Sequence, residues 1–580
     1  MTQFKGIFVG KGQILVGCMQ HWVDAGHKLV SIISDCPEVG EWAAVSNCPV
    51  VSAKGDLAGH LNGKVFDYLF SIVNHAILPD EVLTLPTRRA VNFHDSALPK
   101  YAGFNATSWA IMGGEAVHGV TWHSMTGNVD SGDILLQKTF EISSEDTGFS
   151  VGVKCASACR ETFVELLAAF ESEAESGVPI SVTPQGPTDQ FHLRSDRLGP
   201  GLIDFQHSAS QIDRLVRGLD LGNEDNWMCR PKLLIGDKAF LVEQAELLVD
   251  ANPGMPGQVM AVDADRIDIA ASDGVVRFGR LATADGAHID PVRLGMKVGD
   301  FVPSSAETSV ALGALDARLT KHERFWVRRL SSQRGPALGQ IYAHGGDAQV
   351  SFVRHERNYP AAAYIAALAA SIARSGENEP FDLALAKSLP VEGAGIYASA
   401  APMRISVDLD APFATLLMAV ERELSEQAKR GTYASDIVTR YSALRSAAPN
   451  ASKLPIGLAL GGEAGLVPGT AVSLSVDEAS DEYVLSYDKN AMSQVAVEDI
   501  SERMETLLAD ANERSGLPVA AINLLSEAKK RSLLELAQGP VKSYASDLCV
   551  HQHFEAQVRR TPDATALVFR NQKLTYRELD

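Results

Sequence analysis

Short apolar runs alternate with amphipathic segments over the first part of the chain. Residues 5–9 and 28–33 are mostly apolar, and residues 68–73 form a nearly continuous apolar run, which is typical of strands buried on both faces of a sheet. The segment that ends near Ala25 has the spacing of an amphipathic helix. A strand, a helix and a strand within about thirty residues predict a parallel sheet with right-handed crossovers.

The apolar pattern changes further along the chain. Residues 150–180 have apolar positions at helical spacing and include a glycine stop, which predicts a long helix packed on the sheet. Residues 208–220 predict a short helix. Four short apolar runs between 239 and 278, separated by Gly and Asp turns, predict the strands of a small barrel. From 306 to 540 the chain is rich in Ala and Leu and has no obvious catalytic pattern.

The stretch Asn92–Leu135 carries the candidate chemistry. Residues 91–94 alternate apolar and polar side chains, as at the end of a strand that meets solvent. Residues 106–112 predict a helix, residues 119–125 predict a strand, and Asp130–Asp133 predict a turn. The polar groups of this stretch can therefore meet at one edge of the sheet.

An amide, an imidazole and a carboxylate are the groups concerned. Asn92 and His94 are two residues apart, so on a strand their side chains point the same way. The set suits acyl transfer, in which one group polarises a carbonyl, one moves a proton and one, here Asp130, holds the imidazole. Neither a metal nor a covalent nucleophile is required. Singly, each residue is as consistent with a capped strand or a turn; together they favour catalysis.

A glycine pair follows the first predicted strand. Gly10 and Gly12 begin a pattern of the dinucleotide-binding type, but Leu15 occupies the place of its third glycine. A simple strand-to-helix turn is the favoured interpretation.

Among the seven cysteines, Cys155 and Cys159 lie one helical turn apart. They could form half of a metal site, but no His or Cys nearby completes four ligands. Two small buried residues on one helix face are the favoured interpretation, and no disulfide framework is implied.

Length, composition and charge narrow the function classes. At 580 residues the chain is too long for one core, so several domains are expected. No apolar run approaches the length of a membrane span and the start lacks the pattern of a signal peptide, so we expect a cytoplasmic protein with no membrane partner. The net charge of -20 argues against a nucleic-acid partner, and residues 201–301 alone contain sixteen acidic against ten basic residues.

The motifs of this stretch resemble those of a known enzyme family. The pattern N-x-H-x-S-x-L-P, with a glycine four residues on and D-x-G-D-I further along, is similar to the signature of the 10-formyltetrahydrofolate-dependent formyltransferases. The variant YAGFNATSWAI is most similar to the formyltransferase domains that open some nonribosomal peptide synthetases. The methionyl-tRNA enzymes usually carry Leu where Ala97 stands and Arg where Ala102 stands, which favours an acceptor other than tRNA.

The resemblance implies roles for individual residues. Asn92 would donate to the formyl oxygen, His94 would move the proton and Asp130 would hold His94. The formyl donor would be 10-formyltetrahydrofolate, with no metal. The residues expected to bind the folate are those of the loop that meets the pterin, the loop that leaves room for the donor, and the segment before Asp130: Ile77, Leu78, Pro79, Ser96, Asn128 and Val129.

The remaining segments resemble other parts of a synthetase. Residues 322–330, 402–407 and 483–488 are similar to pieces of the C-terminal lobe of a condensation domain, but its H-H-x-x-x-D-G motif is missing, because no two of the fifteen histidines are adjacent. Residues 551–568 and 574–579 are similar to the start of an adenylation domain.

We therefore expect an α/β protein in four parts. They are a formyltransferase catalytic domain with a Rossmann-like parallel sheet (1–190), a small β-barrel subdomain (191–305), a partial, inactive α+β condensation-like lobe (306–540) and the start of an adenylation domain (541–580).

The acceptor follows from that order of segments. The expected substrate is the amino group of an amino acid held on the phosphopantetheine arm of a downstream carrier domain. The alternatives are formylation of hydroxyornithine in siderophore assembly, formylation of a sugar-nucleotide amine, and an inactive scaffold that has kept the fold.

Overall fold

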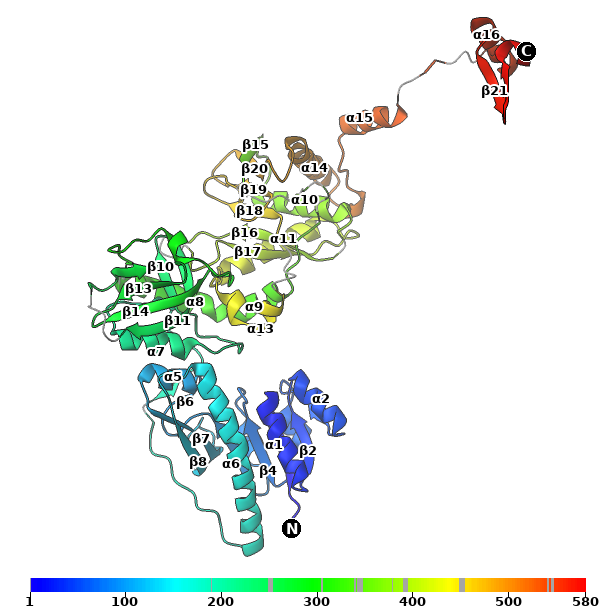
Figure 1. The fold of residues 1–580 in the computed structure, drawn as a ribbon. Helices are drawn as coiled ribbons and strands as arrows, with labels where there is room; N and C mark the ends of the chain where they lie inside the picture. The colour runs from blue at the N-terminus through cyan, green and yellow to red at the C-terminus, as the bar shows by residue number, and fades with distance from the viewer. Residues whose placement is uncertain are drawn as a thin grey trace.

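The computed structural model describes most of the chain. The described residues are 2–188, 190–248, 254–303, 306–337, 339, 341, 348–377, 379–389, 395–447, 454–539, 542–543 and 547–580. Within them, three sheets of at least five strands define three regions, called here the first (2–188), second (190–303) and third (306–522) regions, which follow one another along the molecule (Figure 1).

The first region is built on a sheet of order β3-β2-β1-β4-β5-β7-β8. Its strands are β1 (Lys5–Gly10), β2 (Lys28–Ile33), β3 (Val50–Val51), β4 (Tyr68–Ile72), β5 (Arg89–His94), β7 (Val117–Ser124) and β8 (Ile134–Glu141). The pairs from β3 to β5 are parallel, whereas β7 and β8 are antiparallel to their neighbours. The parallel sheet and the strands expected near residues 5, 28 and 68 are thus confirmed.

Helices cover both faces of this sheet. They are α1 (Gly12–Asp24), α2 (Pro37–Val45), α3 (Leu57–Leu61), α4 (Asp80–Leu83), α5 (Ala106–Gly113) and α6 (Gly148–Ser176). Apolar residues of α1, α2 and α6 pack on one face, and those of α3 and α4 pack on the other. A sheet covered on both faces buries every residue of β4, which explains the continuous apolar run in the sequence.

Two sequence interpretations concern this region. The turn between β1 and α1 is a simple strand-to-helix connection, in which Gly10 has φ of 144° and a Cβ there would lie 1.7 Å from the carbonyl oxygen of Ile72. Cys155 and Cys159 are both buried on α6, as expected of small packing residues, and burial raises the pKa of both thiols.

The second region is a β-rich subdomain with its own core. Helix α7 (Ala209–Leu219) packs against an antiparallel sheet of order β10-β11-β14-β13-β12. The strands are β10 (Lys232–Ile235), β11 (Lys238–Leu248), β12 (Val259–Val262), β13 (Arg266–Ala270) and β14 (Val275–Ala282), followed by η1 (Pro291–Leu294). Strand β9 (Phe191–His192) connects back to the first region by pairing with β6 (Ala102–Gly103).

The third region begins with helices that pack on the second region and continues into a mixed sheet of order β15-β20-β19-β18-β16-β17. The strands are β15 (Val350–Glu356), β16 (Phe381–Ala386), β17 (Ala400–Ile405), β18 (Ile456–Leu460), β19 (Val472–Val476) and β20 (Glu482–Asp488). The helices are α8 (Ala306–Leu319), η2 (Thr320–His322), α9 (Glu323–Ser331), α10 (Ala361–Arg374), α11 (Phe413–Arg430), α12 (Ile437–Arg440), α13 (Ser442–Ala447), α14 (Gln494–Glu513) and η5 (Val519–Ala521). Apolar side chains of α10, α11 and α14 form one core with this sheet.

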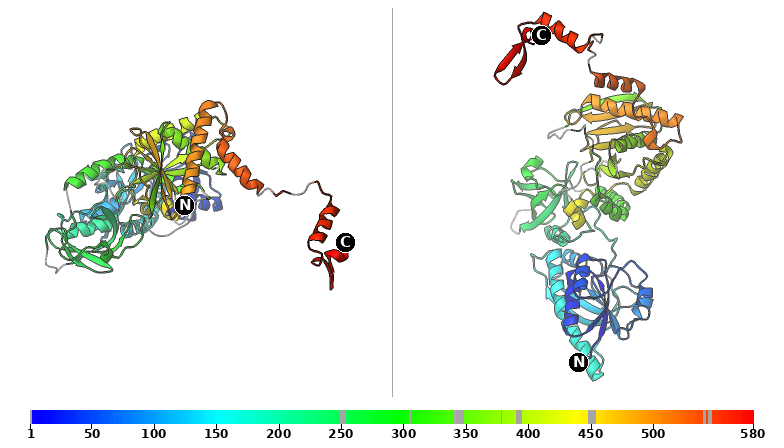
Figure 2. Two further views of the ribbon diagram at one scale, coloured as in Figure 1. Left: turned by 90° about the horizontal axis from the view of Figure 1, so that it is seen from above. Right: turned by 90° about the vertical axis from the view of Figure 1, so that its right-hand side faces the viewer.

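The last elements extend away from the third sheet (Figure 2). They are α15 (Glu527–Gln538), α16 (Val550–Arg560), β21 (Thr565–Phe569), β22 (Gln572–Thr575) and α17 (Tyr576–Leu579), with β21 and β22 forming an antiparallel hairpin. Throughout the described residues, every helix is too short or too polar to cross a lipid bilayer.

A buried ionic network joins the second and third regions. Lys232 Nζ lies 2.6 Å from Asp436 Oδ2, and Arg440 Nε lies 3.0 Å from Asp436 Oδ1. The Arg440 guanidinium also donates to Glu323 Oε2 at 2.7 Å. All four side chains are almost fully buried, so the helices of the third region are fixed against the second.

Candidate functional site

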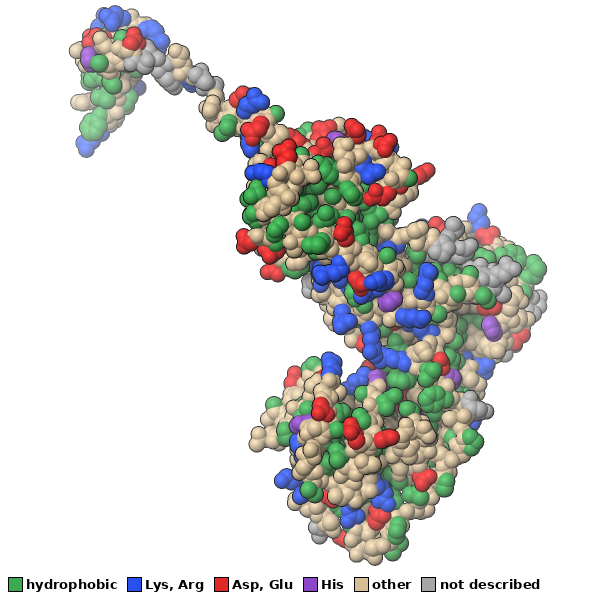
Figure 3. Space-filling model, turned by 180° about the vertical axis from the view of Figure 1, so that it is seen from behind, with side chains coloured by type: hydrophobic (Ala, Val, Ile, Leu, Met, Phe, Trp, Pro, Cys, Tyr) green, Lys and Arg blue, Asp and Glu red, His purple; other side chains and the backbone are tan. Residues whose placement is uncertain are grey.

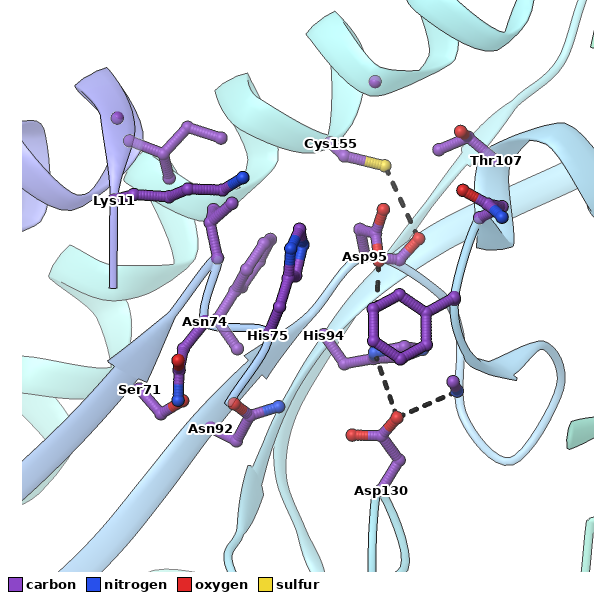
Figure 4. A pocket seen from close by; sticks show the side chains of 18 of the residues that line it. Lys11, Ser71, Asn74, His75, Asn92, His94, Asp95, Thr107, Asp130 and Cys155 are labelled. Atoms are coloured by element: carbon purple, nitrogen blue, oxygen red, sulfur yellow. Dashed lines mark hydrogen bonds and ion pairs between the residues drawn. The ribbon is translucent and has the colours of Figure 1, made fainter. Parts of the chain in front are cut away.

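Two strands and a turn bring the three predicted catalytic residues together. Asn92 and His94 stand at the carboxyl end of β5, and β7 pairs with this strand so that Asn92 is opposite His123. The turn after β7 then returns Asp130, which has φ of 50°, to the same edge. In Figure 4 the side chain of His94 points toward Asp130.

Both ring nitrogens of His94 face acceptors. Nε2–H donates to the carbonyl oxygen of Tyr101 at 2.9 Å, and Nδ1 lies 3.5 Å from Asp130 Oδ2. Asp95 is a second, more distant carboxylate, with Oδ1 3.9 Å from Nδ1. The imidazole is 6% exposed, so its orientation is set by these contacts and not by solvent.

Asp130 is a buried carboxylate that is kept ionised. Burial alone would raise its pKa, but the nearby His94 and His123 and the backbone N–H of Gly103 more than offset burial and hold the pKa at about 2. Gly103 N donates to Asp130 Oδ2 at 2.9 Å. At neutral pH the carboxylate is therefore a fixed negative charge beside the imidazole.

Gly103 is required by close packing. Its φ is 90°, and a Cβ at this position would lie 2.1 Å from the carbonyl oxygen of His192. This contact belongs to the short β6–β9 pairing. Because another residue would push the loop away, Gly103 is what allows its own N–H to reach Asp130.

His123 is a site residue that the sequence analysis did not assign. Its Nδ1–H donates to the carbonyl oxygen of Ser124 at 3.0 Å, and its Nε2 lies 3.1 Å from Asn92 Nδ2 and 3.4 Å from Asp130 Oδ1. With the proton on Nδ1, Nε2 accepts from Asn92 and leaves the second amide N–H of Asn92 free to donate elsewhere. The predicted strand 119–125 includes His123, but only the register of β7 against β5 in the folded chain brings it opposite Asn92.

A cavity of about 940 Å³ opens over these residues. Its walls include Asn92, His94, Asp130 and His123, and it is large enough for a small-molecule donor and part of an acceptor. The far wall comes from residues 221–227 of the second region and from Ser442 of the third.

Four of the six predicted folate-binding residues line this cavity, namely Ile77, Leu78, Asn128 and Val129. Ile77 is 79% exposed and Val129 45% exposed, so apolar surface is left open at the cavity wall. An apolar wall of this kind suits one face of a pterin ring.

Two predicted residues lie elsewhere. Pro79 is outside the cavity wall because it serves as the N-cap residue of α4, where its fixed φ of -63° suits the turn. Ser96 is fully buried and its Oγ donates to the carbonyl oxygen of Lys100 at 2.7 Å. Ser96 closes the loop after β5 and does not line the cavity. The prediction that Ser96 contacts the folate directly is corrected accordingly.

Unpaired polar atoms at the wall provide further hydrogen-bonding capacity for a ligand. Asn105 and Ser108 both line the cavity, and their buried Nδ2 and Oγ atoms have no hydrogen-bond partner among the described residues. Buried polar groups are normally paired, so these atoms are suited to a polar ring such as a pterin. The residues present therefore fit a folate.

His75 lines the cavity, and its ring is flanked by other side chains of the cavity wall. Its ring packs against Phe104 and Trp227, with centroids 5.4 Å and 5.3 Å away. Burial, followed by the positive charges of Lys11 and Arg194, lowers the pKa of His75 to about 4. His75 is therefore neutral at pH 7.

Comparison with known proteins assigns this fold and site to a family. Residues 54–167 match the Formyl transferase model and residues 199–295 match the model of the Formyl transferase C-terminal domain. The chain is 31% identical over 229 residues to a methionyl-tRNA formyltransferase of Koribacter versatilis (strain Ellin345), covering 37% of this chain and 72% of that protein. It is 26% identical over 326 residues to a methionyl-tRNA formyltransferase of Clostridioides difficile (strain 630), covering 53% of this chain and 100% of that protein.

Solved structures are similar at lower identity. HypX from Aquifex aeolicus, in complex with tetrahydrofolic acid, is 18% identical with a TM-score of 0.36, covering 52% of this chain and 51% of that one. The chain belongs to the formyl transferase family. It is a folate-dependent one-carbon transferase, and its formyl donor is 10-formyltetrahydrofolate.

The geometry accounts for formyl transfer by this chain. The donor supplies a formyl group on nitrogen, which is transferred to an amine. The free N–H of Asn92 can donate to the formyl oxygen as negative charge develops there, an effect of roughly 3 kcal/mol in comparable sites. His94 can take the proton that leaves the amine, and the fixed charge of Asp130 stabilises the ring once it is protonated.

Proposed function

We propose that this enzyme formylates the amino group of an amino acid held on the phosphopantetheine arm of a carrier domain in nonribosomal peptide biosynthesis. The observation that carries the proposal is the order of segments. A formyl transferase comes first, and residues 551–579, which resemble the start of an adenylation domain, come last. Adenylation supplies the activated amino acid that such a carrier would bear.

The charge of the second region supports an acceptor other than RNA. Residues 201–301 contain sixteen acidic and ten basic residues, and such a surface repels a polyanion. The residues at positions 97 and 102, both Ala, also differ from the Leu and Arg usual in methionyl-tRNA enzymes.

The third region has the role of a platform in this proposal. It lacks the H-H-x-x-x-D-G motif of condensation domains, and its helices are fixed to the second region by Lys232, Asp436 and Arg440. It would hold the formyl transferase at a defined place within the synthetase.

The test is a transfer assay on an isolated carrier domain. The purified chain is mixed with 10-formyltetrahydrofolate and a carrier loaded with an amino acid, and the carrier is examined by intact mass spectrometry. We expect a gain of one formyl group with the wild-type chain and none with the His94→Ala variant. Free hydroxyornithine and a sugar-nucleotide amine are tested in parallel. Formylation of either one, with the loaded carrier unchanged, would overturn the proposal.

A further inference from the structure

Arg194 stands beside the cavity and has no carboxylate partner among the residues that the structure describes. Its guanidinium carbon lies 4.4 Å from the centre of the Trp227 ring, and Trp227 lines the cavity. In the described part of the chain, no carboxylate is within ion-pair distance of Arg194. By contrast Arg197, three residues on, pairs with both Asp316 and Glu323. A partly buried guanidinium without an anion is poised to receive one.

A second arginine contributes to the same place from the third region. Arg324, exposed on α9, also has no ion pair among the described residues, and its charge acts on both Arg194 and His75. Of the charges that act on His75, Lys11, Arg194 and Arg324 lower its pKa and Asp95 alone opposes them. Three of the four charges that act on His75 are thus positive, although the net charge of the chain is -20.

The cavity mouth is a built structure that joins two regions. Ser442, through its backbone N–H and its hydroxyl, donates to Asp225 Oδ1, each at 2.8 Å. Arg445 donates to the carbonyl oxygen of Asn223. Trp227 Nε1 is buried at this mouth and has no hydrogen-bond partner in the described residues. The carboxylate of Asp225, one of the acidic residues on the wall, thus already accepts hydrogen bonds from Ser442.

The surface view agrees with this account. Figure 3 shows the molecule hollowed between the first region and the regions that follow it, with Lys and Arg side chains gathered along the hollow. An acceptor that enters here passes the basic side chains before it reaches His94.

We propose that Arg194 and Arg324 bind the phosphate of the acceptor's phosphopantetheine arm at this mouth, with Trp227 Nε1 as a further donor. The inference rests on the proposed function, because it takes its acceptor from there. A guanidinium can donate two parallel hydrogen bonds to a phosphate, and Arg194 is already oriented by the Trp227 ring. The third region would then contribute a residue to acceptor recognition.

Binding of two arm analogues tests the site without needing turnover. Isothermal titration calorimetry compares 4′-phosphopantetheine with pantetheine, which lacks only the phosphate. The wild-type chain is expected to bind the phosphorylated analogue roughly tenfold more tightly. The Arg194→Gln and Arg324→Gln variants should each reduce this ratio, and the double variant should bring it close to one. Arg422→Gln, at an exposed position on α11 outside the cavity wall, is the matched control and should keep the wild-type ratio.

Each other result decides against the site. Equal binding of the two analogues by the wild-type chain, or no binding of either, would overturn it. A double variant that still binds 4′-phosphopantetheine more tightly than pantetheine, by the wild-type ratio, would also overturn it. A raised KM for 10-formyltetrahydrofolate, with the ratio unchanged, would assign the arginines to the carboxylates of the donor. Arg324→Gln keeps the test valid if Arg194→Gln disturbs Trp227.

The proposed function fails separately from this inference. If 4′-phosphopantetheine binds selectively through the arginines but a loaded carrier is not formylated, the phosphate site stands and the proposed acceptor is wrong. If the loaded carrier is formylated but the analogues bind equally, the proposed function stands and the phosphate site is wrong.

Discussion

Two groups of buried ionisable side chains in this protein are built in opposite ways. At the contact of the second and third regions, Asp436 meets Lys232 at 2.6 Å and Arg440 at 3.0 Å. At the end of β5, Asp130 meets His94 and His123 at 3.5 Å and 3.4 Å. The first group is closed by protein on all sides, whereas the second opens on a cavity of about 940 Å³.

The two groups show how a charge that ties regions together differs from a charge at a cavity. Asp436 has a strongly lowered pKa because Lys232 and Arg440 outweigh the effect of its burial, and Asp436 does not line the cavity. Asp130 also has a lowered pKa, but its partners are the imidazoles of His94 and His123, which line the cavity. A perturbed pKa therefore marks both groups, and the cavity is what distinguishes them.

Removal of the imidazole at the open group should have the largest effect. His94→Ala removes the proton acceptor, so we expect kcat to fall by ~10²–10⁴ while the thermal midpoint changes little. A steady-state formylation assay measures the loss, with His207→Gln, an exposed histidine of the second region, as the control. If His94→Ala keeps its turnover, this group is structural and the comparison fails.

Removal of a carboxylate at the closed group should affect stability and not chemistry. Asp436→Ala leaves the buried ammonium of Lys232 without a carboxylate and leaves Arg440 with Glu323 alone, and breaking a buried pair in this way costs about 3–5 kcal/mol in similar cases. Denaturant unfolding of the variant should show the loss. Asp263→Ala, which breaks an exposed ion pair with Arg266, is the matched control and should change little. Equal effects of the two variants would show that the closed group is not a structural tie.

A double-mutant cycle sharpens the comparison inside the open group. His123→Ala removes the acceptor that orients the amide of Asn92, so we expect kcat to fall roughly tenfold, equivalent to about 1.4 kcal/mol or one hydrogen bond. If His123 acts through Asn92, adding His123→Ala to Asn92→Ala should cost little more. Fully additive losses would instead give His123 a role of its own.

The smallest effect concerns pH and His75. Its pKa is lowered from 6.5 to about 4 in the folded chain, so between these values the unfolded chain binds the proton more readily. Stability should therefore fall as the pH is lowered from 6.5 toward 4. We expect His75→Gln to show a smaller drop in thermal midpoint between pH 7 and pH 5 than the wild-type chain. Identical drops would contradict the lowered pKa.

Much of the first region could be predicted from local pattern. Strand β2 has the predicted bounds, β1 and β4 differ by one residue, and α6 spans most of the predicted helix. Asn92, His94 and Asp130 do meet at the sheet edge. These predictions succeeded because strand and helix periodicity and the order of parallel strands depend on neighbours in sequence.

Other site residues depended on distant packing. His123 is placed by the register of β7 against β5. Ser96 points inward because its hydroxyl donates to the carbonyl oxygen of Lys100 in the loop after β5. Ser442 reaches the cavity only because helices of the third region pack on residues 223–227. No local pattern marks such a contact.

The amino-acid sequence alone predicts the alternation of strands and helices, the three residues expected to be catalytic and the resemblance to the family. Tertiary packing fixes which residues enclose the cavity, which histidine contacts the amide of Asn92 and which arginines have no carboxylate partner among the described residues. Periodicity is a property of neighbouring residues, so it can be seen in the sequence. Burial, pairing of charge and the shape of a cavity depend on residues that lie far apart in the chain, such as Asp225 and Ser442, whose hydrogen bond joins positions 217 residues apart.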